Sequence, residues 1–155
     1  MKRRMWLAAL AGLLMTAAAG IAADDPTMGT WKLDEAKSKI TAGTPKNTTV
    51  MYEASGDSIK VTIDGVGADG KATHDEWTGK YDGKDYPVTG DASADTRSYK
   101  RVNSHTLVAS NHKGGKVVLT ARIVVSADGK TRTVTVTTTD ASGKKVSSTS
   151  VYDKQ

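Results

Sequence analysis

The 155-residue chain contains no cysteine, no phenylalanine and only three prolines. Without cysteine it has no disulfide scaffold, no Cys-ligated zinc or iron–sulfur site, no thiol nucleophile and no lipid-modified N-terminal cysteine. Without phenylalanine, any pocket must be built from Trp, Tyr, Val and Ile. The length suits one domain with a modest core.

The first 23 residues predict a cleavable secretory signal peptide. Lys2, Arg3 and Arg4 are followed by an uncharged, apolar stretch that is shorter than the ~20 strongly apolar residues of a membrane span. Small residues offer cleavage after Ala19, Ala22 or Ala23. The segment 3–7 also resembles a twin-arginine signal, so both the general secretory and the twin-arginine routes stay open. We therefore expect a secreted or periplasmic protein with its single domain at 24–155 and no integral membrane span after cleavage.

Removal of this segment changes the charge of the chain. The full sequence has 22 Lys and Arg against 17 Asp and Glu, a net charge of +5, and the mature chain keeps 19 basic residues and a net charge of +2. No basic run remains. The sequence therefore gives no support to nucleic-acid binding.

Short segments rich in Val, Thr, Ile and Tyr recur about every ten residues from Thr30 onward, separated by turns with Asp-Gly, Gly-Gly or Ser-Gly. This spacing is typical of antiparallel all-β structure. Apolar side chains alternate at Ile59, Val61 and Ile63, and from Val117 to Val125. The predicted strands are 29–34, 47–54, 58–64, 71–80, 85–89, 96–102, 105–111, 116–126, 131–139 and 144–153.

About ten strands joined by tight hairpins predict an up-and-down meander closed into a barrel, because closure removes exposed edges. A two-sheet sandwich is the rival fold, but its crossovers need longer connections. The one candidate helical stretch is Asp34–Lys39. No longer helical segment separates the strands, so a parallel βαβ fold is excluded.

Two segments carry a family resemblance. The opening Gly29-Thr30-Trp31-Lys32-Leu33 and the closing Val151-Tyr152-Asp153-Lys154 resemble the first and last strands of the lipocalins and fatty-acid-binding proteins, the calycins. The segments 52–54, 64–66, 81–90 and 94–96 resemble small secreted bacterial lipocalin-like proteins of unassigned function. The resemblance implies a barrel with Trp31 at its closed end. The arginine that holds the ligand carboxylate in fatty-acid binders is Ser150 here, and 35–46 is too short for their helical lid.

Arg97, Tyr99 and Arg101 alternate along one predicted strand and so share one face. If Tyr99 faces inward, an arginine could pair with an anionic ligand group while Tyr52, Trp77 and Tyr152 line the apolar part. The opposite register, with Val102 inward and both arginines in solvent, is favoured because unpaired charges are seldom buried.

His74-Asp75-Glu76 is the densest group of potential metal ligands. With Trp77 pointing inward, His74 and Glu76 point to solvent, which favours an ordinary polar face over a metal or acid–base site. Gly65–Gly70 fits G-x-G-x-x-G, but a strand rather than a helix is expected to follow, so these are interpreted as turn glycines. We expect no metal, no cofactor and no catalysis.

The sequence thus predicts a monomeric, non-catalytic protein that binds a small apolar or amphipathic molecule, with Tyr52, Trp77, Arg97, Tyr99, Arg101 and Tyr152 as candidate ligand-binding residues. The alternative is a structural or interaction module of the cell envelope with a side-chain-filled barrel. An enzyme using His74 and Glu76 with a metal is a third, more distant class.

Overall fold

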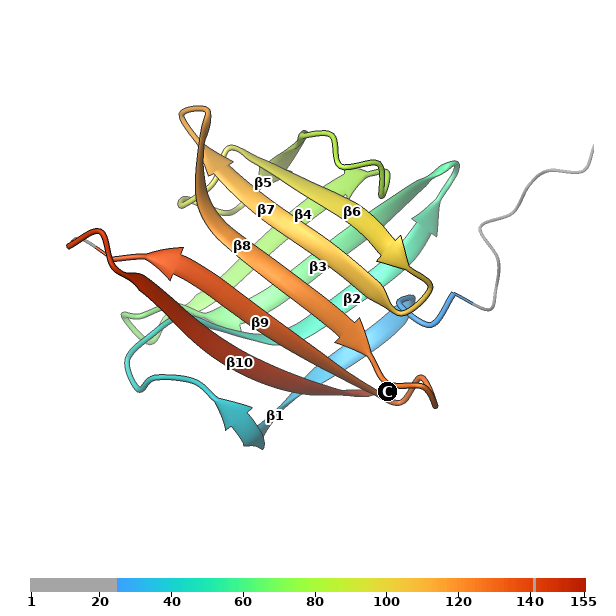
Figure 1. The fold of residues 1–155 in the computed structure, drawn as a ribbon, viewed down its shortest axis with the longest axis horizontal. Helices are drawn as coiled ribbons and strands as arrows, with labels where there is room; N and C mark the ends of the chain where they lie inside the picture. The colour runs from blue at the N-terminus through green and yellow to red at the C-terminus, as the bar shows by residue number, and fades with distance from the viewer. Residues whose placement is uncertain (1–24, 141) are drawn as a thin grey trace, which may run out of the picture.

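A computed structural model describes residues 25–140 and 142–155, so the expected signal peptide lies outside the described residues. Within these residues, ten antiparallel strands form a meander that closes into a barrel through pairing of the first strand with the last, as the sequence predicted (Figure 1). The strands are β1 (Gly29–Lys39), β2 (Lys46–Ser55), β3 (Ser58–Val66), β4 (Ala72–Gly79), β5 (Tyr86–Thr89), β6 (Thr96–Asn103), β7 (Thr106–Lys113), β8 (Lys116–Val125), β9 (Thr131–Thr139) and β10 (Lys145–Lys154).

Alternation of side chains produces the core. In β3 the side chains of Ile59, Val61 and Ile63 are buried while Lys60 and Thr62 between them are not. Val117 is an exception, because a register shift opposite it, between Asn111 and His112, leaves it 56% exposed. The prediction that Val117 faces inward is therefore wrong, whereas Ala121, Ile123 and Val125 do face inward.

The expected helical stretch Asp34–Lys39 is the second half of β1, so this prediction is wrong. The backbone N–H of Lys37 donates to the Asp34 carboxylate at 3.2 Å, and Ser38 Oγ donates to the Asp34 carbonyl at 2.7 Å. Ser38 Oγ also accepts from Val151 N–H of β10 at 2.9 Å. The side chains thus make helix-like local hydrogen bonds within an irregular strand that stays attached to the sheet.

Trp31 lies at one end of the barrel, as expected, and is fully buried. Its indole N–H donates to the Thr27 carbonyl at 3.1 Å, so residues 25–28 cover this end. We call this end the floor. The opposite end, bordered by the loops 40–45, 67–71 and 90–95, is the mouth.

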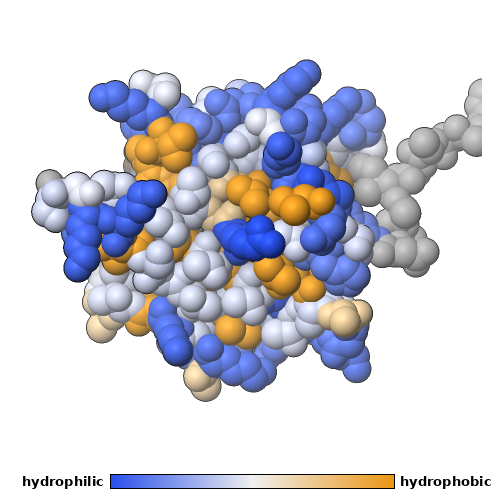
Figure 2. All heavy atoms as spheres, in the orientation of Figure 1, coloured by the Kyte–Doolittle hydropathy of each residue, from blue (hydrophilic) through white to orange (hydrophobic). Residues whose placement is uncertain are grey.

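The outer surface carries few apolar side chains. Figure 2 shows small hydrophobic groups separated by hydrophilic and intermediate residues on the face in view. Among the described residues the most exposed large apolar side chains are Val102, Val117, Val118, Val124 and Val146. No helix among the described residues is long and apolar enough to cross a membrane.

Candidate functional site

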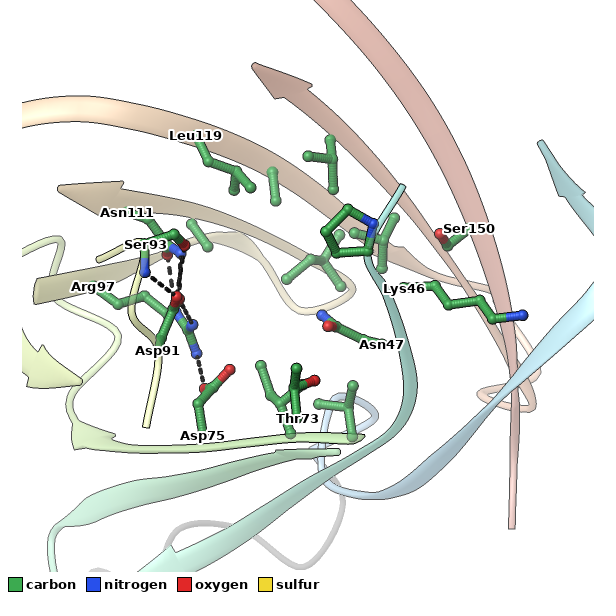
Figure 3. A pocket seen from close by; sticks show the side chains of 18 of the residues that line it. Lys46, Asn47, Thr73, Asp75, Asp91, Ser93, Arg97, Asn111, Leu119 and Ser150 are labelled. Carbon is green, nitrogen blue, oxygen red and sulfur yellow. Dashed lines mark hydrogen bonds and ion pairs between the residues drawn. The ribbon is translucent and has the colours of Figure 1, made fainter. Parts of the chain in front are cut away.

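The interior of the barrel holds a cavity of about 470 Å³ that reaches from the mouth toward the floor. Its middle is apolar, and both of its ends carry polar and charged side chains. Figure 3 shows Arg97, Asp75 and Asp91 on one side of it. The apolar wall is formed by Val50, Ile63, Ala109, Leu119, Ala121, Ile123, Val134 and Val136.

Arg97 is the centre of a hydrogen-bonded group at the mouth. Its guanidinium donates from Nη1 to Asp75 Oδ1 at 2.8 Å, from Nη2 to Asp91 Oδ2 at 3.2 Å and from Nε to Asn111 Oδ1 at 2.9 Å. These four residues, which we call the mouth cluster, come from β4, the β5–β6 loop, β6 and β7 (Figure 3). Each nitrogen of the guanidinium therefore has a partner.

Local sequence explains how Asp75 and Asp91 reach the cavity. Asp75 lies between His74 and Glu76 on β4, so these neighbours point outward while Asp75 points inward. Asp91 follows Gly90, which has a φ of +85° and lies so close to the carbonyl of His74 that a Cβ atom would collide with it. Glycine at position 90 thus lets the β5–β6 loop turn tightly over the end of β4.

The mouth cluster contains two carboxylates and one guanidinium. Burial raises the pKa of the Asp75 carboxyl above its ordinary value, and the ion pair with Arg97 offsets this only in part. Burial alone would lower the pKa of Arg97, but its neighbours, the Asp75 and Asp91 carboxylates among them, raise it instead. The guanidinium thus stays charged, and the mouth cluster has two carboxyl groups for one cation.

Tyr52, Trp77 and Tyr99 form an aromatic group beside the cavity. The centre of the Tyr99 ring lies 4.7 Å from the centre of the Trp77 ring and 6.2 Å from that of the Tyr52 ring, and both pairs have edge-to-face geometry. The Trp77 indole N–H donates to the Arg97 carbonyl at 2.7 Å. Tyr52 and Tyr99 line the cavity, whereas Trp77 packs behind them and supports β6.

The register of β6 is the one that places Arg97 and Tyr99 inside. Val102 is 52% exposed and Arg97 is 4% exposed, so the favoured reading with Val102 inward and both arginines in solvent is wrong. The prediction failed because it considered the β6 sequence alone. Asp75 and Asp91 come from other segments and supply the countercharge that allows Arg97 to be buried.

Arg101 lies toward the floor and does not line the cavity. Its Nη2 donates to Asp25 Oδ2 at 2.5 Å, and its guanidinium stacks 4.9 Å from the centre of the Tyr81 ring. Of the six candidate ligand-binding residues, four line the cavity, namely Tyr52, Arg97, Tyr99 and Tyr152, while Trp77 and Arg101 do not. Their role in binding a ligand stays a prediction.

Arg132, the second deeply buried arginine, is not among the residues predicted from the sequence. Arg132 is 3% exposed and lines the cavity. Its guanidinium carbon lies over three aromatic rings, 4.5 Å from the centre of Tyr152, 5.2 Å from that of Tyr52 and 5.5 Å from that of Trp31. Its Nε and Nη1 atoms are buried without a hydrogen-bond partner. A signal was present, because Arg132, Val134 and Val136 alternate along β9 and so share the inward face.

The side chains of His74 and Glu76 are exposed on the outer face of β4, as expected, although His74 borders the mouth of the cavity. His74 Nδ1 lies 2.7 Å from Asp64 Oδ1, and His74 Nε2 lies 3.7 Å from Glu76 Oε1. No group of three or more His, Asp or Glu side chains within 25–140 and 142–155 is arranged to hold a metal ion. Gly65–Gly70 leads into strand β4 and not into a helix, so it is not a dinucleotide-binding turn. Gly70, with a φ of +77°, forms the turn, whereas Gly65 lies within β3, where a Cβ atom would collide with the Lys46 carbonyl.

Comparison with known protein families finds no match for the chain, and no curated protein matches it either. The closed barrel of ten antiparallel strands is compatible with a calycin-like fold. Beyond this compatibility, the likeness to lipocalins and fatty-acid-binding proteins depends on the short segments at the two ends of the chain.

Proposed function

We propose that this protein is a lipocalin-like binding protein that holds a small apolar or amphipathic molecule inside the barrel without transforming it. The observation that carries the proposal is the cavity of about 470 Å³. Ligand cavities commonly measure ~300–1,000 Å³ and combine an apolar wall with a few polar groups. The expected signal peptide supports a site of action in the periplasm or outside the cell.

The alternative of a structural module assumed that side chains fill the barrel. Small residues on the inner wall, Ala109 and Ala121, argue against it, because their short side chains leave open part of the cavity that they line. A barrel selected only for stability gains by filling such space, since cavities are costly. The open interior therefore favours the binding proposal.

Native mass spectrometry of the protein purified from its own source tests this proposal. We expect a bound small molecule that is displaced on denaturation. Ala121→Phe places a ring in the cavity and should abolish the adduct. Thr120→Phe is the matched control, because Thr120 is the outward-facing neighbour on β8 and its substitution should leave the adduct in place. Adduct-free protein, or an adduct that survives Ala121→Phe, would overturn the proposal.

A further inference from the structure

Arg132 is a buried cation without a countercharge. Among the ion pairs of the described residues, Arg97 has Asp75 and Asp91, and Arg101 has Asp25, but none involves Arg132. Two of its nitrogen atoms have no hydrogen-bond partner. Burial of a charge that is neither paired nor fully hydrogen-bonded is costly, so a group left in this state inside a cavity points to a missing partner.

The aromatic rings around Arg132 hold it in place and do not replace that partner. The guanidinium carbon lies 4.5 Å from the centre of the Tyr152 ring, 5.2 Å from that of Tyr52 and 5.5 Å from that of Trp31. Contact with a ring face stabilises the charge but leaves the in-plane N–H groups unbonded. The planar fork of an arginine is suited to a carboxylate or a similar oxyanion.

The two ends of the cavity have opposite charge. Arg132 is an unneutralised cation toward the floor, whereas the mouth cluster has two carboxylates for one guanidinium. Lys46, which also lines the mouth, is paired with Glu35 at 2.7 Å. Between them lies the apolar wall of Val, Ile and Ala side chains. An anionic group is therefore attracted to the inner end and repelled at the outer end.

We propose that the ligand is a linear amphiphile with a single anionic group. The ligand enters the cavity with its anionic group first, this group pairs with Arg132 at the floor, and the apolar chain lies along the wall toward the mouth. This inference rests on the proposed function. It assigns the ligand-recognition role to Arg132 and gives Arg97 a structural role at the mouth.

Three probes of one chain length test the inference on the intact mature protein: sodium decanoate, decan-1-ol and decylammonium chloride, each titrated by calorimetry. We expect decanoate to bind about tenfold or more tightly than decanol, as a charge-assisted hydrogen bond to Arg132 would give, and decylammonium to bind most weakly. This ranking needs no variant, so it holds even if a substitution impairs folding.

Variants then assign the preference to Arg132. Arg132→Met should reduce the affinity for decanoate to that for decanol, and Arg132→Lys should restore part of the difference. Lys154→Met is the matched control: Lys154 Nζ lies 5.1 Å from the Trp31 ring but Lys154 does not line the cavity, so the preference should be unchanged.

The outcomes separate the two proposals. If all three probes bind with equal affinity, or if Arg132→Met keeps the preference for decanoate, this inference is overturned and the binding function stands. If none of the three probes binds while native mass spectrometry shows an adduct that Ala121→Phe abolishes, the inference is overturned and the binding function stands. If no adduct is found either, both are overturned.

Discussion

Arg97 and Arg132 are both more than nine-tenths buried in the same cavity wall, yet their surroundings differ. Arg97 uses its three nitrogens on two carboxylates and an amide oxygen. Arg132 has aromatic rings over its face and two nitrogens without a partner. Burial alone therefore does not show the role of a charged residue: a charge with partners in the fold is costly to remove, while an unsatisfied one is available to a ligand.

The largest expected loss of stability comes from removing the cation of the mouth cluster. Arg97→Met leaves Asp75 and Asp91 buried without their cation, and we expect the free energy of unfolding to fall by about 3–5 kcal/mol. Urea denaturation measures this. Adding Asp75→Asn and Asp91→Asn to the same variant should recover part of the loss, because the uncompensated charges are then gone. A loss below about 1 kcal/mol would show that the mouth cluster does not stabilise the barrel.

A smaller loss of stability is expected when the β5–β6 loop is displaced and its charges are unchanged. Gly90→Ala places a Cβ atom against the His74 carbonyl at a φ of +85°, so we expect a loss of about 2–3 kcal/mol. Gly129→Ala is the matched control, since Gly129 has a φ of +71° and open space around it, and should cost only about 1 kcal/mol. Equal losses in thermal unfolding of the two variants would mean that crowding over β4 contributes nothing.

Arg132→Met should change stability much less than Arg97→Met. The loss of contact with the aromatic rings costs about 2 kcal/mol, and removal of the unpaired buried N–H groups returns about 1–3 kcal/mol. We therefore expect the free energy of unfolding, measured in urea without ligand, to stay within about 1 kcal/mol of the parent value. A loss as large as that of Arg97→Met would instead show that Arg132 is a structural residue and that the two arginines contribute alike to stability.

The smallest effect concerns charge pairing outside the barrel. The Asp64 carboxylate, with a contribution from Glu76, raises the pKa of His74 above its ordinary value. Protonated His74 therefore adds stability that is complete below about pH 6.5 and is lost as the pH rises through the higher pKa of the folded state.

Melting temperatures of the parent and of His74→Gln between about pH 5.5 and pH 8.5 measure this contribution. The two curves should differ slightly at the acid end and converge at the alkaline end, and Asp64→Asn should mimic His74→Gln. Because His74 is exposed, solvent screens the pair and the difference should be small. A gap that widens with rising pH would contradict the assigned direction.

Local patterns predicted the fold because they determine most of it. Glycine turns at regular spacing and alternation such as Ile59, Val61 and Ile63 are properties of neighbouring residues, and they correctly indicated ten strands and a closed meander. The failure at 34–39 has a local cause as well. Asp34 and Ser38 are spaced for helix-like hydrogen bonds, but pairing with β10 decides the outcome.

The site was less predictable because it depends on residues that meet only in the folded chain. The inward direction of Arg97 depends on Asp75 and Asp91, which reach it from β4 and from the β5–β6 loop. Arg132 could have been found from its place in the alternating pattern of β9. Its lack of a countercharge, in contrast, could not be read from any single strand, since it depends on everything packed around the guanidinium.

The pairing of β1 with β10 has a consequence for the order of folding. Trp31 lies opposite Lys154, so the seam that closes the barrel joins the two most widely separated strands of the chain. Contacts of such large sequence separation slow folding. A chain that folds before β10 is in place would present β1 and β9 as unpaired edges, which invite aggregation. The last strand therefore protects two edges of the sheet when it closes the barrel.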